Sequence, residues 1–252
     1  RGPSVEEYIA RGDAYFEQGK FSEAAIEYRN VLQRDGQNGA VRLKLGDTYL
    51  RMNDGTAAAR EFIRAADLLP QDATAQIKAG QLLVLGQAFE DARTRAEKAL
   101  AIDPSSVEAQ ILRGNALAGL KDLGGAIKDY EDAIARDPSR AELFANLGAI
   151  QFASGNREQA EATFRKAVDV APTSVDARLA LANFLWASGR AADSEEALRG
   201  ALQLDPKNVA ANRALGVFLL ATGRGAEAEP NFKAIADAAG SVDARLTLAQ
   251  YY

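Results

Sequence analysis

The sequence predicts an all-α protein built from a row of similar helix pairs, and three regularities in its 252 residues predict this fold. Small residues recur at fixed phases, and apolar residues follow the i, i+3, i+4, i+7 spacing of amphipathic helices. A fixed period of this size is typical of proteins made of repeated structural units. The period itself is 34 residues and is set by Pro70, Pro104, Pro138, Pro172 and Pro206.

Seven repeats can be numbered from Val5, each with two helices joined by a short turn. The segment 174–179, Ser-Val-Asp-Ala-Arg-Leu, recurs at 241–246 and predicts the first helix of an eighth repeat at 242–252. The chain begins without Met, so we expect residues 1–4 to be a leader or remnant. We expect one solenoid over 5–252, with repeats that start at residues 5, 39, 73, 107, 141, 175, 209 and 242.

The start and the end of each helix pair have local signals. Proline stops a helix, because it lacks an N–H group and clashes with the preceding turn. The next helix then needs an N-cap, and six of the seven residues before a repeat start are favoured caps. Ser4 with Glu7 also forms a capping-box pattern. The six cap residues are Ser4, Asn38, Asp72, Ser106, Ser174 and Asn208; the seventh position holds Arg140.

Small residues in both helices predict close packing within each pair. The eighth place of the repeat is glycine in six of seven repeats, as at Gly46, and the twentieth is alanine in six of seven, as at Ala58. Glycine in a helix costs up to about 1 kcal/mol relative to alanine, so a close contact must offset it. The twenty-fourth place is large, as at Phe62, except at Ala96. We expect this large side chain to fill the remaining gap.

The seventh repeat departs from the pattern. It lacks the Asp-Pro pair, and Pro230 falls inside its second helix. We therefore expect that helix to start late or to kink.

Composition excludes several classes of function. The net charge of −5 gives no basic footprint, so no nucleic-acid partner is expected. No apolar run approaches the roughly 18 residues of a membrane span. Histidine and cysteine are absent, which removes the commonest general base, the commonest transition-metal ligands and all disulfides. Acidic pairs such as Glu195–Glu196 are interpreted as solvated helix faces, so no catalytic residue, metal or cofactor is predicted.

The chain resembles the tetratricopeptide repeat (TPR) family over 5–252. The second repeat carries the family pattern in Leu45-Gly46, Tyr49, Ala58, Phe62 and Pro70. The resemblance implies a right-handed α-superhelix in which first helices line a concave groove and second helices form the outer face. It also implies partner binding without catalysis.

In this family the second, fifth, ninth, twelfth and thirteenth places of each repeat commonly face the groove. These places are largely apolar here, although many of the aliphatic side chains could equally pack between neighbouring first helices. The chaperone-tail clamp of the family needs Lys in the fifth place before Asn in the ninth, and it is absent. The groove candidates are Ile9, Phe16, Leu43, Leu50, Ile77, Val84, Ile111, Asn115, Phe152, Leu179, Asn183, Trp186 and Leu220.

Trp186, the only tryptophan, is the main candidate contact. It follows Asn183 by three residues and Leu179 by seven, so the three share one helix face. Phe152 holds the same place one repeat earlier and is expected beside Trp186. The favoured hypothesis is groove exposure of Trp186, and the alternative is a core position.

The sequence and the family resemblance support two functional hypotheses. The first is a non-catalytic scaffold that holds an apolar helix or extended segment of a partner protein or peptide in the groove. The alternative is a structural or self-assembling solenoid that associates through its C-terminal helix. The even, alanine-rich repeats resemble long bacterial cell-envelope proteins of exopolysaccharide export or protein sorting, which favours the envelope or periplasm over the cytoplasm.

Overall fold

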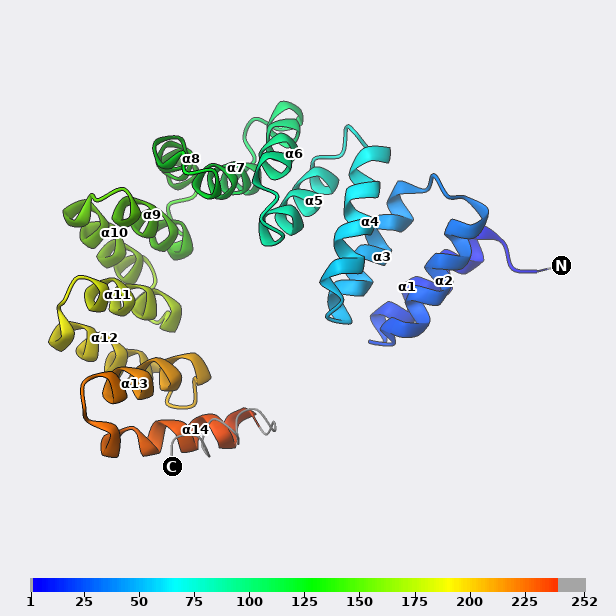
Figure 1. Cartoon of the computed structure of the whole chain (residues 1–252). Coiled ribbons are helices and arrows are strands. Elements are labelled where there is room, and N and C mark those ends of the chain that lie inside the picture. Colours follow the sequence, from blue (N-terminus) through cyan, green and yellow to red (C-terminus); the bar gives the residue numbers. More distant parts are fainter. Residues whose placement is uncertain (1, 240–252) are drawn as a thin grey trace. The chain divides into compact units, whose positions relative to one another are not determined.

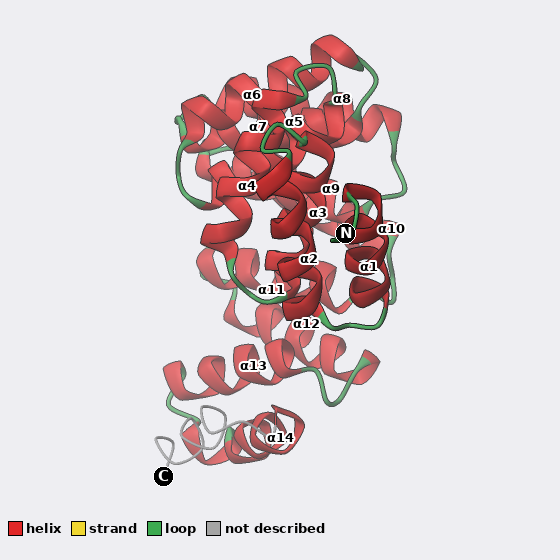
Figure 2. Ribbon diagram, turned by 90° about the vertical axis from the view of Figure 1, so that its right-hand side faces the viewer, coloured by secondary structure: helices red, strands yellow, loops and turns green. Residues whose placement is uncertain are grey.

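The computed structural model describes residues 2–239, and within that range it contains fourteen α-helices, one short 3-10 helix and no strand. Figure 2 shows the helices joined by short loops. The predicted all-α helical-repeat fold is confirmed. The helix predicted at 242–252 lies outside the described residues.

First and second helices alternate along the chain (Figure 1). The first helices are α1 (Val5–Glu17), α3 (Gly39–Arg51), α5 (Ala73–Leu85), α7 (Val107–Gly119), α9 (Ala141–Ala153), α11 (Val175–Ala187) and α13 (Val209–Ala221). The second helices are α2 (Phe21–Arg34), α4 (Gly55–Leu68), α6 (Phe89–Ile102), α8 (Leu123–Arg136), α10 (Arg157–Val170), α12 (Ala191–Leu204) and α14 (Glu229–Ala239).

The chain divides into two compact units, residues 1–132 and 133–252, with the boundary inside α8. We refer to them as unit 1 and unit 2. Within each unit, first and second helices of the same repeat pack on one another, as α3 and α4 do in unit 1 and α9 and α10 do in unit 2.

The predicted N-caps are confirmed. Each of the six cap side chains accepts a hydrogen bond from the backbone N–H three residues on. In the capping box, Ser4 Oγ accepts from Glu7 N at 3.2 Å and Glu7 Oε2 accepts from Ser4 N at 2.6 Å. Arg140 makes no such bond. Local side-chain chemistry thus sets where the first helices begin.

The glycine column packs against the large residue of the twenty-fourth place, as predicted. A Cβ atom added at Gly46 would lie 2.5 Å from the ring of Phe62, which is fully buried. Where Ala96 breaks the aromatic column, a Cβ at Gly80 would instead meet Leu112 of the next first helix at 2.4 Å. A neighbouring repeat therefore fills the space that its own second helix leaves open.

The second helix of the seventh repeat starts late, which confirms the expectation from Pro230. The other second helices begin at the place that Gly225 holds here, but residues Gly225–Glu227 form a 3-10 turn and α14 begins at Glu229. Pro230 thereby falls in the first turn of α14. Backbone N–H groups in a first turn have no intrahelical acceptor, so proline costs no helix hydrogen bond there.

Candidate functional site

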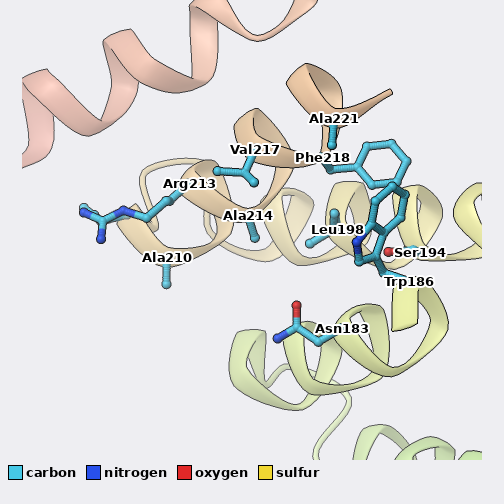
Figure 3. A pocket seen from close by; sticks show the side chains of 11 residues that line it. Asn183, Trp186, Ser194, Leu198, Ala210, Arg213, Ala214, Val217, Phe218 and Ala221 are labelled. Carbon is cyan, nitrogen blue, oxygen red and sulfur yellow. The ribbon is translucent and has the colours of Figure 1, made fainter. Parts of the chain in front are cut away.

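The main candidate site is a hollow of about 550 Å³ in unit 2, bounded by α11, α12 and α13 (Figure 3). We call it the Trp186 hollow. The side chains that line it are Asn183, Trp186, Ser194, Leu198, Val209, Ala210, Arg213, Ala214, Val217, Phe218 and Ala221.

A buried cluster forms the base of the hollow. Leu198 of α12 and Phe218 of α13 pack there with Ala182, Leu215 and other buried residues. Ser194 takes the place that alanine holds in the other repeats, and its hydroxyl donates to the Ala182 carbonyl at 2.9 Å. The only buried hydroxyl of the lining is therefore already hydrogen-bonded, and the base presents an apolar surface.

Trp186 forms one end of the hollow. Its ring packs on Phe218 with centroids 5.0 Å apart at an interplanar angle of 68°. This edge-to-face arrangement is favourable for aromatic pairs. The indole nevertheless remains 43% exposed. One face of Trp186 thus belongs to the fold, and the rest of its surface is available to a partner.

The two walls differ in polarity. Asn183 of α11 is exposed and makes no hydrogen bond with any residue in the described part of the chain, so its amide can both donate and accept. Val217 of α13 is 54% exposed. Arg213 lies on α13 at the end of the hollow opposite Trp186 (Figure 3).

The lining offers no acid–base chemistry. Arg213 is its only ionisable residue, and a guanidinium stays protonated at any physiological pH. Within residues 2–239, no group of three or more acidic side chains could hold a metal ion. None of the helices described is long and apolar enough to cross a membrane. The lining is thus apolar apart from Arg213, Asn183 and Ser194, and it contains no carboxylate, imidazole or thiol.

The structure brings Asn183 and Trp186 together but pairs their predicted neighbours elsewhere. We expected Phe152 beside Trp186; instead Phe152 packs edge-on against Phe184, with centroids 5.4 Å apart. Leu179 packs against the buried cluster under the hollow and does not line it. In both repeats the twelfth-place ring thus packs on the tenth-place ring of the next repeat, Phe152 on Phe184 and Trp186 on Phe218.

The other groove candidates are divided between the units. In unit 1, the twelfth-place Leu50 is exposed, and the remaining candidates are half-buried. Asn115 accepts a hydrogen bond from the buried Tyr130 hydroxyl at 2.7 Å, so part of its amide is occupied. In unit 2, Leu220 of α13 is 46% exposed but is not among the residues that line the hollow. The half-buried candidates of unit 1 are Ile9, Phe16, Leu43, Ile77, Val84, Ile111 and Asn115.

The equivalent surface of unit 1 is charged. Asp13 accepts hydrogen bonds from Lys44 Nζ at 2.6 and 2.7 Å and from Tyr28 Oη at 2.6 Å. Burial raises the pKa of Asp13, but the bonds from Lys44 and Tyr28 outweigh it and hold the pKa below its ordinary value. Burial and the bond to Asp13 raise the pKa of Tyr28. Lys78 pairs with Asp47 in the same way one repeat later.

Sequence reasoning named none of the seven α13 residues that line the hollow. Four of them, Ala210, Arg213, Val217 and Ala221, hold the second, fifth, ninth and thirteenth places of the seventh repeat, which are groove places in the TPR pattern. Their positions were therefore predictable. The other three, Val209, Ala214 and Phe218, lie outside the groove places of that pattern.

Consecutive helix pairs with this packing define a helical-repeat protein. Two family models described as tetratricopeptide repeat match the chain, one at residues 77–141 and 146–209 and the other at 15–82, 117–169 and 185–239. The chain belongs to the tetratricopeptide repeat family. Proteins of this family are generally non-catalytic scaffolds for protein–protein interaction.

Solved structures share the fold at low sequence identity. A tetratricopeptide repeat protein from Parabacteroides merdae ATCC 43184 is 17% identical with a TM-score of 0.80, over 99% of both chains. A thermophilic TPR protein of Thermus thermophilus is 22% identical with a TM-score of 0.64, over 72% of this chain and 99% of its own. MamA from Desulfovibrio magneticus RS-1 is 19% identical with a TM-score of 0.63, over 69% and 98%. No curated protein sequence matches the chain.

Proposed function

We propose that this protein is a non-catalytic scaffold that holds an apolar helix or extended segment of a partner protein, with the Trp186 hollow as its principal contact. The observation that carries the proposal is the exposure of Trp186 and Val217 in the lining of one hollow of about 550 Å³. Clustered exposed apolar surface marks interaction sites in soluble proteins, and tryptophan is enriched among the residues that dominate binding energy.

The chemistry of the lining favours a segment over a small molecule or a charged tail. The hollow is open along first helices, and its long apolar side offers contacts for successive side chains of one segment. Asn183 is placed to hydrogen-bond the backbone of such a segment, since an extended chain has unpaired N–H and C=O groups.

The proposal is tested with defined peptides and the single tryptophan. A displayed library of random dodecapeptides is selected against the protein and, in parallel, against the Trp186→Ala variant. Selected peptides are then synthesised and titrated against the protein while its Trp186 emission is recorded. We expect apolar peptides that are enriched only by the unmodified protein and that shift the emission.

Two results would count against the scaffold. Equal enrichment by the protein and Trp186→Ala would place binding elsewhere. The absence of any enriched peptide, with concentration-dependent oligomers in light scattering, would favour the self-assembling solenoid instead.

A further inference from the structure

We infer that the Trp186 hollow selects apolar segments that carry a carboxylate about three residues from the apolar residue that contacts Trp186, which we call the apolar anchor. Arg213 is the residue that binds this carboxylate. The inference rests on the proposed function and specifies the chemistry of the partner segment. It follows from the free charge at one end of an otherwise neutral, apolar hollow.

Arg213 differs from the arginine of α12 and from those in the turns before α12 and after α13. Arg190 pairs with Glu161 at 2.6 Å, and Arg224 pairs with Glu195 at 2.6 Å. Arg199 also pairs with Glu195, at 2.7 Å. Arg213 is exposed, and its side chain makes no ion pair or hydrogen bond with any residue between positions 2 and 239. Its five N–H donors therefore have no protein acceptor there.

The remaining lining leaves this charge uncompensated. No acidic side chain lines the hollow, and its polar members other than Arg213 are the Asn183 amide and the bonded Ser194 hydroxyl. A cation at the edge of an apolar surface attracts carboxylates and disfavours cationic side chains. A guanidinium can donate two parallel hydrogen bonds to the two oxygens of a carboxylate, whereas an amide of the partner has only one such oxygen.

Helix geometry sets the spacing between the two contacts. Trp186 packs on Phe218, which follows Arg213 by five residues, and Ala221 lines the hollow eight residues after Arg213. At about 1.5 Å per residue, the backbone of Arg213 and the Trp186 end of the hollow are about 8–12 Å apart along α13. An extended segment covers this distance in about three residues at roughly 3.3 Å each. The partner segment should therefore combine an apolar residue with Asp or Glu about three positions away.

The test compares libraries and matched peptides. The same dodecapeptide library is selected against the unmodified protein, Arg213→Gln, Arg213→Lys and Arg64→Gln. Arg64 is an exposed arginine on α4 in unit 1 and does not line the hollow, so Arg64→Gln removes an equal charge without changing the lining. The most enriched peptide is then synthesised with its acidic residue and with the corresponding amide, and both are titrated by Trp186 fluorescence.

We expect Asp and Glu to be enriched about three positions from the apolar anchor, and the acidic peptide to bind roughly fivefold more tightly than its amide partner. Arg213→Gln should abolish the preference for the acidic peptide and keep the enrichment of apolar residues. Arg213→Lys should keep part of the acidic preference, and Arg64→Gln should leave that preference unchanged. Equal binding of the acidic and amide peptides, or a preference that survives in Arg213→Gln, would overturn the inference while the scaffold function stands. Failure to enrich any apolar peptide would overturn both.

Discussion

The indole of Trp186 rests edge-on against the ring of Phe218 on the next first helix, with 5.0 Å between the ring centroids. Phe218 itself is buried in the cluster under the hollow, whereas Trp186 stays 43% exposed. The pair thus links the core of unit 2 to its candidate binding surface. It also orients the indole before any partner arrives, which reduces the entropy lost on binding.

Replacing Trp186 by alanine should weaken binding of a selected apolar peptide about thirtyfold, or about 2 kcal/mol. The free energy of unfolding should fall by only about 1–2 kcal/mol, because a single aromatic pair and part of the indole surface are lost. Peptide titration by anisotropy and urea denaturation measure the two effects. Leu85→Ala is the matched control, since Leu85 is 78% exposed in unit 1 and its removal should change neither. A stability loss of about 3–5 kcal/mol with unchanged binding would make Trp186 a core residue instead.

Two glycine-to-alanine changes in the same repeat should have opposite effects. Gly46→Ala would place a Cβ atom 2.5 Å from the buried ring of Phe62 and should destabilise the protein by about 1–3 kcal/mol. Gly55, at the start of α4, has nothing within 4 Å of an added Cβ, so Gly55→Ala should raise stability by about 0.5 kcal/mol. Thermal denaturation of both variants checks this. Similar stabilities for the two would show that the close contact at Gly46 is relieved by movement of Phe62.

The start of the first repeat can be tested through its cap. Ser4→Ala removes the acceptor for Glu7 N and should cost about 1 kcal/mol, concentrated in the first turn of α1. Ser22, an exposed residue of α2 with no hydrogen bond from its side chain to a described residue, gives the control change Ser22→Ala. Hydrogen exchange should quicken at residues 5–8 only in Ser4→Ala. Unchanged exchange there would mean that packing of α1, and not the cap, holds its first turn.

Helix positions were predictable because they depend on local chemistry. Caps such as Ser106 and Asn208 and stops such as Pro104 act within a few residues, and the period repeats that information seven times. The late start of α14 followed from Pro230 for the same reason. Nothing beyond the nearest turn was needed for these predictions.

The candidate site was predictable only in part, because its contacts join different repeats. Spacing shows that Asn183 and Trp186 share a face of α11, but it does not show which residue of α13 meets the indole. That depends on the rotation between successive helix pairs, which placed Phe218, not an equivalent ring such as Phe152, under Trp186. The charge of Arg213 could not be judged from sequence either, since whether its side chain finds a partner among residues 2–239 depends on three-dimensional neighbours.

The hydrogen bond from Tyr28 to Asp13 should contribute to the stability of unit 1 in a pH-dependent way. Tyr28→Phe keeps the ring that packs over Gly12 and removes only the hydroxyl, which donates to Asp13 Oδ1 at 2.6 Å. The loss at neutral pH should be about 1 kcal/mol, because Asp13 is partly exposed and keeps its bond from Lys44. Urea denaturation across a range of pH measures it.

The direction of the pH effect follows from the lowered pKa of Asp13. Its folded-state pKa lies below the ordinary 3.8, so the stabilisation is fully present above pH 3.8 and is lost as the pH falls through the folded-state value. The difference between the protein and Tyr28→Phe should therefore be constant near neutral pH and shrink below pH 3.8. Tyr15→Phe is the control, since the Tyr15 hydroxyl has no hydrogen bond to a described residue and its removal should give no such pH-dependent difference. A Tyr28→Phe difference that stays the same down to strongly acidic pH would show that the hydroxyl stabilises unit 1 without favouring the ionised form of Asp13.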